Sequence, residues 1–204
     1  MIWIFYVLLD IVANIIAYIT NPIVVLFADE RGNLPRFLRW WQTHDNPLDI
    51  EWMISEGNVP SFARYDFNKH YKYVPEWDAE KETGTRKGYV ILLDDKFTLK
   101  ERIQRYICRL CWLYRNTAYT FGYEVCGKTA LRENTRIIKN ERRCDSWYFK
   151  AKDDTGTWSL YYVNRWCKWF YLRVYLGWKM TGILSYDKLR CMLAVYVNPF
   201  RLVK

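Results

Sequence analysis

The sequence predicts an α+β fold. A hydrophobic N-terminal helix, predicted to be transmembrane, precedes a domain with one main amphipathic helix and a C-terminal antiparallel β-meander of about four strands. Three observations support this: an apolar run without Lys or Arg at the start, apolar side chains at helical spacing in 98–118, and a period of two from residue 146. We therefore divide the chain into an anchor at 1–28 and a single α+β domain at 29–204.

The apolar run Ile2–Ala28 holds one formal charge, Asp10. As a helix, Ile2–Thr20 covers roughly 28 Å, about one hydrocarbon core. Its eleven Ile, Leu, Val and Phe residues contribute roughly −5 kcal/mol to insertion, whereas a central Asp costs about +3 kcal/mol and Asn14 adds to that cost. The sum is near zero, so the polar groups need shelter. Asn21-Pro22 predicts a kink or a stop.

Small and polar residues form one stripe along this helix, and bulky aliphatic residues surround it. The stripe consists of Tyr6, Asp10, Ala13, Asn14, Ala17 and Asn21. In a membrane this pattern is typical of a helix that packs against another helix. No second apolar stretch long enough to span follows residue 28, so we predict self-association or hetero-association with another chain. An in-plane or peripheral anchor and a buried soluble helix are the alternatives.

Positive charge follows the apolar run and none precedes it, which predicts that the rest of the chain is cytoplasmic. A short helix after the run combines aromatic and basic side chains. We expect it to lie at the membrane interface through Arg36, Phe37, Arg39, Trp40 and Trp41. Its apolar positions, which include Leu34 and Leu38, have α-helical spacing, so a core helix packed on the domain is the alternative.

Residues 29–97 are rich in aromatic side chains and Pro, and we expect ordered loops and short strands there. Thr98 and Glu101 match a capping box that opens a helix over residues 98–118. Its predicted buried face includes Ile107 and Leu110, with the arginines off that face. Period-two patterns then predict four strands within 146–198, namely Trp147–Lys152, Thr157–Val163, Phe170–Lys179 and Met192–Val197.

Three features together resemble a group of uncharacterised proteins from tailed bacteriophages. They are the apolar N-terminus, the segment LFADERGNLPRFLRWWQTHDNPLD and the late GWK…YVNPFR. The resemblance spans most of the chain. It implies a viral origin and a bacterial host, and the group has no known function to transfer.

Candidate chemical sites are weak. A zinc site would use Cys108, Cys111, Cys126 and Cys144, but a second closely spaced pair is missing and the first pair falls inside the predicted helix. His44 and Asp45, with Asp49 and Glu51 nearby, fit a solvated pair better than an acid–base group. No G-x-S-x-G, P-loop or dinucleotide motif occurs. We expect no catalytic residues, no cofactor and no enzymatic activity.

These observations favour a membrane-anchored, non-enzymatic phage protein at the host inner membrane. Its cytoplasmic domain would bind a protein partner in host takeover or counter-defence. The first alternative is a soluble oligomeric interaction or virion protein whose N-terminal helix is buried. The second is a nucleic-acid-binding protein, which is suggested by the net charge of +9 alone.

Overall fold

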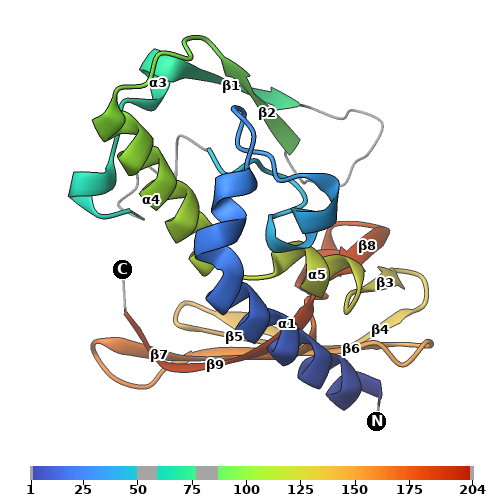
Figure 1. The fold of residues 1–204 in the computed structure, drawn as a ribbon. Helices are drawn as coiled ribbons and strands as arrows, with labels where there is room; N and C mark the ends of the chain where they lie inside the picture. Colours follow the sequence, from blue (N-terminus) through green and yellow to red (C-terminus); the bar gives the residue numbers. More distant parts are fainter. Residues whose placement is uncertain (1, 50–58, 77–86, 203–204) are drawn as a thin grey trace. The chain divides into compact units, whose positions relative to one another are not determined.

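The computed structural model describes residues 2–49, 59–76 and 87–202. The chain divides into two compact units. The sheet unit consists of Met1–Leu9 and Gly122–Lys204, and the helical unit consists of Asp10–Phe121. The long helix α1 (Ile2–Val24) therefore begins in the sheet unit and ends in the helical unit (Figure 1).

Apart from α1, the helical unit contains one long helix, α4, and several short elements. In chain order the elements are η1 (Val25–Phe27), η2 (Arg36–Trp41), η3 (Ser61–Ala63), α3 (Phe67–His70), β1 (Tyr71–Glu76), β2 (Lys87–Leu92) and α4 (Leu99–Arg115). Strands β1 and β2 form an antiparallel pair. In a further short helix, α5 (Tyr119–Glu124), the helical unit ends at Phe121 and the sheet unit resumes at Gly122.

Helix α4 begins with the predicted capping box. The Thr98 hydroxyl accepts from the Glu101 amide at 3.3 Å, and the Glu101 carboxylate accepts from the Thr98 amide at 2.8 Å, which satisfies two free donors of the first turn. The helix ends at Arg115, three residues before the predicted end, and Ala118 has a φ of 46°.

The predicted buried face of α4 is wrong by about one position. Its buried residues are Cys108, Arg109, Trp112 and Leu113, whereas Ile107 and Leu110 are half-buried. The physical reason is that Arg109 forms a buried ion pair with Asp49, so the side of the helix that carries Arg109 faces the core. The core around it joins residues that follow α1, such as Val25 and Leu34, to α4.

The sheet unit confirms the predicted C-terminal meander and extends it by one strand. Five antiparallel strands lie in the order β4 (Thr135–Arg143), β5 (Ser146–Asp153), β6 (Trp158–Arg165), β7 (Phe170–Trp178) and β9 (Leu193–Leu202). A second, two-stranded sheet pairs β3 (Lys128–Leu131) with β8 (Lys188–Cys191), and η4 (Thr181–Leu184) precedes β8.

The inner face of the five-stranded sheet explains part of the high aromatic content. Phe149, Tyr161 and Tyr175 pair across three neighbouring strands, and all three are buried. Gly177 lies one row further along this face with a φ of 91°. A Cβ there would lie 2.2 Å from the Trp158 carbonyl oxygen, so this position requires Gly.

Candidate membrane-facing site

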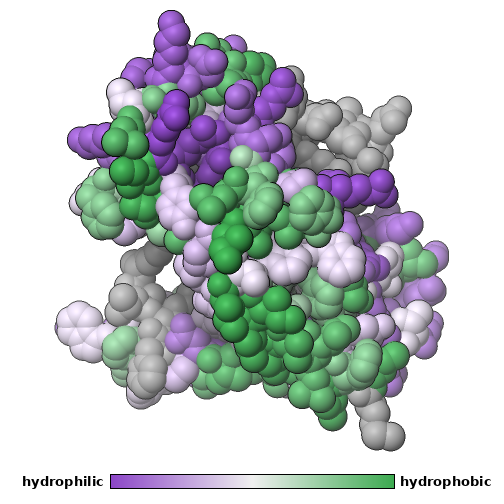
Figure 2. All heavy atoms as spheres, in the orientation of Figure 1, coloured by the Kyte–Doolittle hydropathy of each residue, from purple (hydrophilic) through white to green (hydrophobic). Residues whose placement is uncertain are grey.

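Exposure separates α1 into two faces. Five large aliphatic side chains lie along one side of the helix, and each is 47–73% exposed. We call this set the outer ridge: Ile4, Leu8, Ile11, Ile15 and Ile19. At about 100° per residue, the predicted polar stripe lies on the opposite side of the helix. Figure 2 shows the apolar side chains gathered along α1. By length and composition, α1 with η1 is the one helix in the described part of the chain that could cross a membrane.

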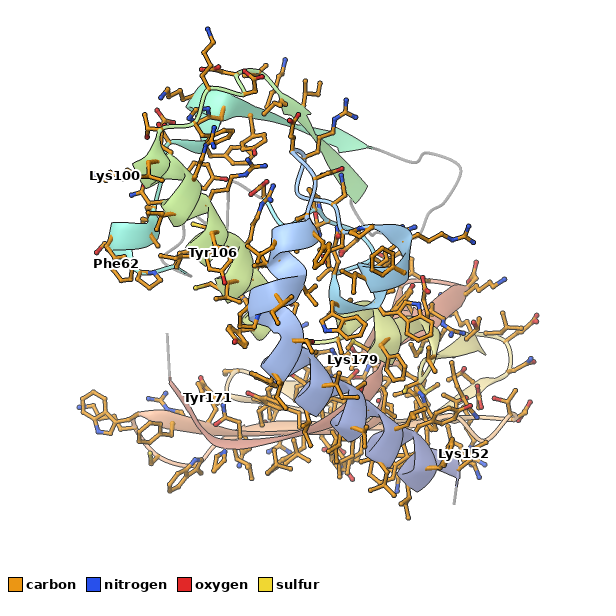
Figure 3. All side chains as sticks on the ribbon, in the orientation of Figure 1. Phe62, Lys100, Tyr106, Lys152, Tyr171 and Lys179 are labelled. Atoms are coloured by element: carbon orange, nitrogen blue, oxygen red, sulfur yellow. The ribbon has the colours of Figure 1, made fainter. Side chains whose placement is uncertain are left out.

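Pro22 leaves a free carbonyl inside α1, and α4 supplies its donor. Because Pro has no N–H, the Tyr18 carbonyl lacks its usual partner. The Tyr114 hydroxyl donates to that carbonyl at 3.3 Å, and the two tyrosine rings stack at 5.5 Å. The Tyr106 hydroxyl donates to the Pro22 carbonyl at 3.0 Å, in the last turn of the helix (Figure 3). Two tyrosines of α4 therefore hold the C-terminal end of α1.

The N-terminal end of α1 is held differently, by ring contacts inside the sheet unit. Trp3 packs on Trp158 with ring centroids 5.2 Å apart, and Tyr6 meets Trp178 edge-on at 6.5 Å. Trp178 is fully buried and donates from its indole nitrogen to the Cys126 carbonyl at 2.9 Å, so its ring is fixed. These contacts attach the first two turns of α1 to β6 and β7.

The segment η2 is a 3₁₀-helix, which sorts its six residues into three faces. With three residues per turn, side chains at i and i+3 eclipse. The resulting pairs are Arg36 with Arg39, Phe37 with Trp40, and Leu38 with Trp41. Leu38 and Trp41 pack against the core, whereas Phe37 and Trp40 are 72% and 47% exposed. The Trp41 indole donates to the Thr20 hydroxyl of α1 at 3.0 Å. Exposed aromatic and basic side chains thus lie on a segment bonded to α1.

A buried ion-pair cluster fixes the chain just after α1 to α4. The Asp49 side chain is fully buried and accepts from Arg109 Nε at 3.0 Å and from Arg109 Nη2. Arg109 also donates to the Asp29 carbonyl at 2.8 Å. Arg105 lies 3.4 Å from Asp49 and donates to the Glu30 carbonyl at 2.7 Å. Both arginines therefore join one buried carboxylate to backbone that immediately follows the apolar run.

Titration shifts in this cluster favour a structural role. Burial alone lowers the pKa of Arg109, but the charge and hydrogen bonds of Asp49 outweigh burial and raise it. Burial, with Asp49 nearby, raises the pKa of Tyr65 and of Tyr71 well above the usual range. The Tyr65 hydroxyl donates to Asp49 at 3.3 Å. Arg109 thus stays charged and the two tyrosines stay neutral, which suits a structural role.

The residues of the predicted stripe share the inner side of α1. Ala17 and Asn21 are buried, and Tyr6, Asp10, Ala13 and Asn14 are half-buried. The Asn14 amide donates to the backbone carbonyl of Asp10 at 2.8 Å. Association of the stripe with another chain stays a prediction.

The structure does not form a metal site from the candidate cysteines or from the described residues around His44. Among the described residues, no group of three or more His, Cys, Asp or Glu side chains could hold a metal ion. Cys108 donates to the Ala63 carbonyl at 3.0 Å, and burial raises the pKa of its thiol to about 12. His44 stacks on Tyr119, Asp49 faces Arg109, and Glu51 lies outside the described residues.

Sequence reasoning missed the two attachments of α1. One signal was available: a Pro inside an apolar helix frees a carbonyl, and Tyr106 and Tyr114 on the next long helix could supply donors. The pairing of Asp49 with Arg109 had no such signal, because 60 positions separate the two residues.

The comparison with protein families covers the entire chain. Residues 1–204 match a family of unknown function, DUF7338. The chain belongs to this family. No curated protein and no solved structure matches it. The family therefore carries no substrate or partner to this chain, and a proposal about function depends on the surface described above.

Proposed function

We propose that this chain is a membrane-associated, non-enzymatic protein of bacteriophage origin. It holds its folded part at the cytoplasmic face of the bacterial inner membrane and there binds a protein partner, in host takeover or counter-defence. The observation that carries the proposal is the outer ridge of α1, five large aliphatic residues exposed along one helix. Large exposed apolar patches mark interaction surfaces.

The size of the ridge fits reversible membrane binding. Burying the exposed parts of these five side chains contributes roughly 4–9 kcal/mol, at about 1.5–3 kcal/mol for each fully buried aliphatic side chain. That is comparable to one acyl chain, which binds a membrane only marginally. Arg36 and Arg39 are exposed beside Phe37 and Trp40. Each adds about 1 kcal/mol at an anionic surface, so ridge and arginines act together.

Exposed apolar side chains in the sheet unit support the proposed protein partner. Trp166 and Trp169, between β6 and β7, and Val195 and Val197, on β9, are 50–64% exposed. Trp is enriched in the centres of protein interfaces. The Trp166 ring is oriented by its indole nitrogen, which donates to the Pro199 carbonyl at 2.7 Å. An exposed aromatic ring whose orientation is already fixed by a hydrogen bond suits a binding surface.

Fractionation and flotation test the membrane association. The full chain should be recovered with membranes and should float with vesicles of phosphatidylethanolamine and phosphatidylglycerol. Ile15→Lys and Ile19→Lys should abolish flotation, whereas Ile138→Lys, at an equally exposed Ile of β4, should not. A wild-type chain that stays soluble and does not float would overturn the proposal.

The same ridge gives the second candidate, a soluble oligomer in which copies of α1 cover one another. Sedimentation without lipid or detergent separates the two. A defined oligomer that Ile15→Lys converts to monomer, without flotation, would favour it. Nucleic-acid binding, the remaining alternative from the net charge of +9, predicts an affinity that falls steeply with added salt.

A further inference from the structure

We infer that α1 lies in the plane of the membrane surface, with its outer ridge in the lipid of an anionic bilayer, and does not cross it. This inference rests on the proposed membrane association and adds the orientation of the helix. It departs from the transmembrane orientation that length and composition alone predict. The contacts at the two ends of α1, its polarity and the charges beside it all lead to the same orientation.

Both ends of α1 are in contact with folded protein. Near the start, Trp3 and Tyr6 pack on rings of the sheet unit. Near the end, Tyr18, Thr20 and Pro22 are bonded to side chains of the helical unit. From Trp3 to Thr20 the helix rises roughly 26 Å, close to the thickness of a hydrocarbon core. A spanning orientation would therefore place these two sets of contacts in different aqueous compartments.

The order of the chain makes such a separation impossible with one crossing. Residues 10–121, which hold the C-terminal end of α1, precede residues 122–204, which hold its N-terminal end. A spanning α1 would require the chain to cross the membrane again between residues 25 and 122. Among the described residues, α1 with η1 is the one helix long and apolar enough to cross. With both sets of contacts formed, α1 stays on one side.

The polarity of α1 fits an in-plane orientation better than a spanning one. A spanning helix would place Asp10 well inside the hydrocarbon, where an ionisable side chain is expensive. Asp10 and Asn14 lie on the side opposite the outer ridge and are half-buried. In the plane of the surface, the ridge enters the lipid while both polar residues point away from it. The insertion balance, near zero for a spanning helix, then has no central Asp to overcome.

The charges beside α1 select an anionic bilayer as the occupant. The Trp41 indole bonds η2 to Thr20, next to the last residue of the outer ridge, Ile19. On η2 the exposed Phe37 and Trp40 alternate with Arg36 and Arg39. Aromatic and basic side chains beside an aliphatic surface are typical of a headgroup region with anionic lipids.

Depth measurements along the ridge test the orientation. Single Cys residues are placed at Ile4, Ile11 and Ile19 in the full chain, with Cys111, Cys144 and Cys167 replaced by Ser, since Cys108, Cys126 and Cys191 are buried. Each variant is spin-labelled and bound to vesicles of phosphatidylethanolamine and phosphatidylglycerol. A label at Ile138 is the aqueous control. The depth of each label is read from its collisions with oxygen and with a water-soluble nickel complex.

An in-plane helix places all three ridge labels at nearly the same depth, about 5–10 Å below the headgroups. A spanning helix gives a graded profile whose deepest label, at Ile11, lies near the bilayer centre, about 15 Å deep. That graded profile would overturn the inference and leave the proposed membrane association standing. Failure to bind vesicles, or ridge labels as aqueous as the control, would overturn both.

Discussion

The two ends of α1 are attached by contacts of opposite character. At the C-terminal end, tyrosine hydroxyls bond to helix carbonyls, and the buried Asp49 and Arg109 fix the chain that follows. At the N-terminal end, Trp3 and Tyr6 make ring contacts with Trp158 and Trp178. Hydrogen bonds and buried ion pairs demand fixed geometry, whereas ring packing tolerates small shifts. We therefore expect the N-terminal end of α1 to detach before the C-terminal end.

Removing the buried carboxylate should have the largest effect. Asp49→Ala leaves Arg109 buried without its partner, so it should destabilise the protein by about 3–5 kcal/mol. Denaturant unfolding of the full chain measures this. Glu133→Ala, at an exposed acid, is the matched control and should change stability by less than about 0.5 kcal/mol. An equal effect of the two substitutions would mean that the cluster does not hold the C-terminal attachment.

Substitutions that weaken the attachment of only one end of α1 should have effects of intermediate size. Trp3→Ala removes the ring contact with Trp158, worth about 0.5–1.5 kcal/mol beyond its buried area. Hydrogen exchange should then quicken at the amides of residues 6–9 and stay unchanged at residues 18–24. Tyr114→Phe removes the donor to the Tyr18 carbonyl, a net loss of about 1 kcal/mol, and should do the reverse. Identical exchange patterns in the two variants would contradict independent attachments.

The elements that the sequence predicted correctly carry local signals. The capping box of Thr98 and Glu101 opens α4, and period-two patterns mark β5, β6, β7 and β9. The errors arise where distant residues decide. Arg109 looked like a surface residue because the acid that buries it, Asp49, lies 60 positions away. The pairing of β3 with β8 is likewise non-local, and no short turn joins the two strands to predict it from sequence.

The segment η2 shows a signal that was present and misinterpreted. Its apolar positions from Leu34 to Trp41 fit α-helical spacing, which predicts that Phe37 shares one face with Leu38 and Trp41. The sequence Arg-Phe-Leu-Arg-Trp-Trp also repeats every three residues, which is the period of the 3₁₀-helix that forms. Phe37 consequently points outward at 72% exposure. For the candidate site this matters, because the aromatic side chains predicted for the interface divide between core and surface.

The smallest effect should come from an exposed ion pair on the same helix that holds α1. Glu101 caps α4 and lies 2.8 Å from Lys69 and 3.2 Å from His70. The hydrogen bond from Lys69, then those from Thr98 and His70, lowers the pKa of Glu101 far below its ordinary value of 4.5. A lowered folded-state pKa means that ionised Glu101 stabilises the fold above pH 4.5, and that this contribution is lost as the pH falls further.

Glu101→Gln should therefore lower stability slightly at neutral pH, and the difference from wild type should shrink as the pH falls below 4.5. The effect should be far smaller than that of Asp49→Ala, because exposed pairs are screened by solvent. Unfolding measured across this pH range, with Glu133→Gln as control, tests the sign. A difference that grows towards acidic pH would mean that the folded state favours protonated Glu101. The contrast between exposed and buried ion pairs on α4 would then need another explanation.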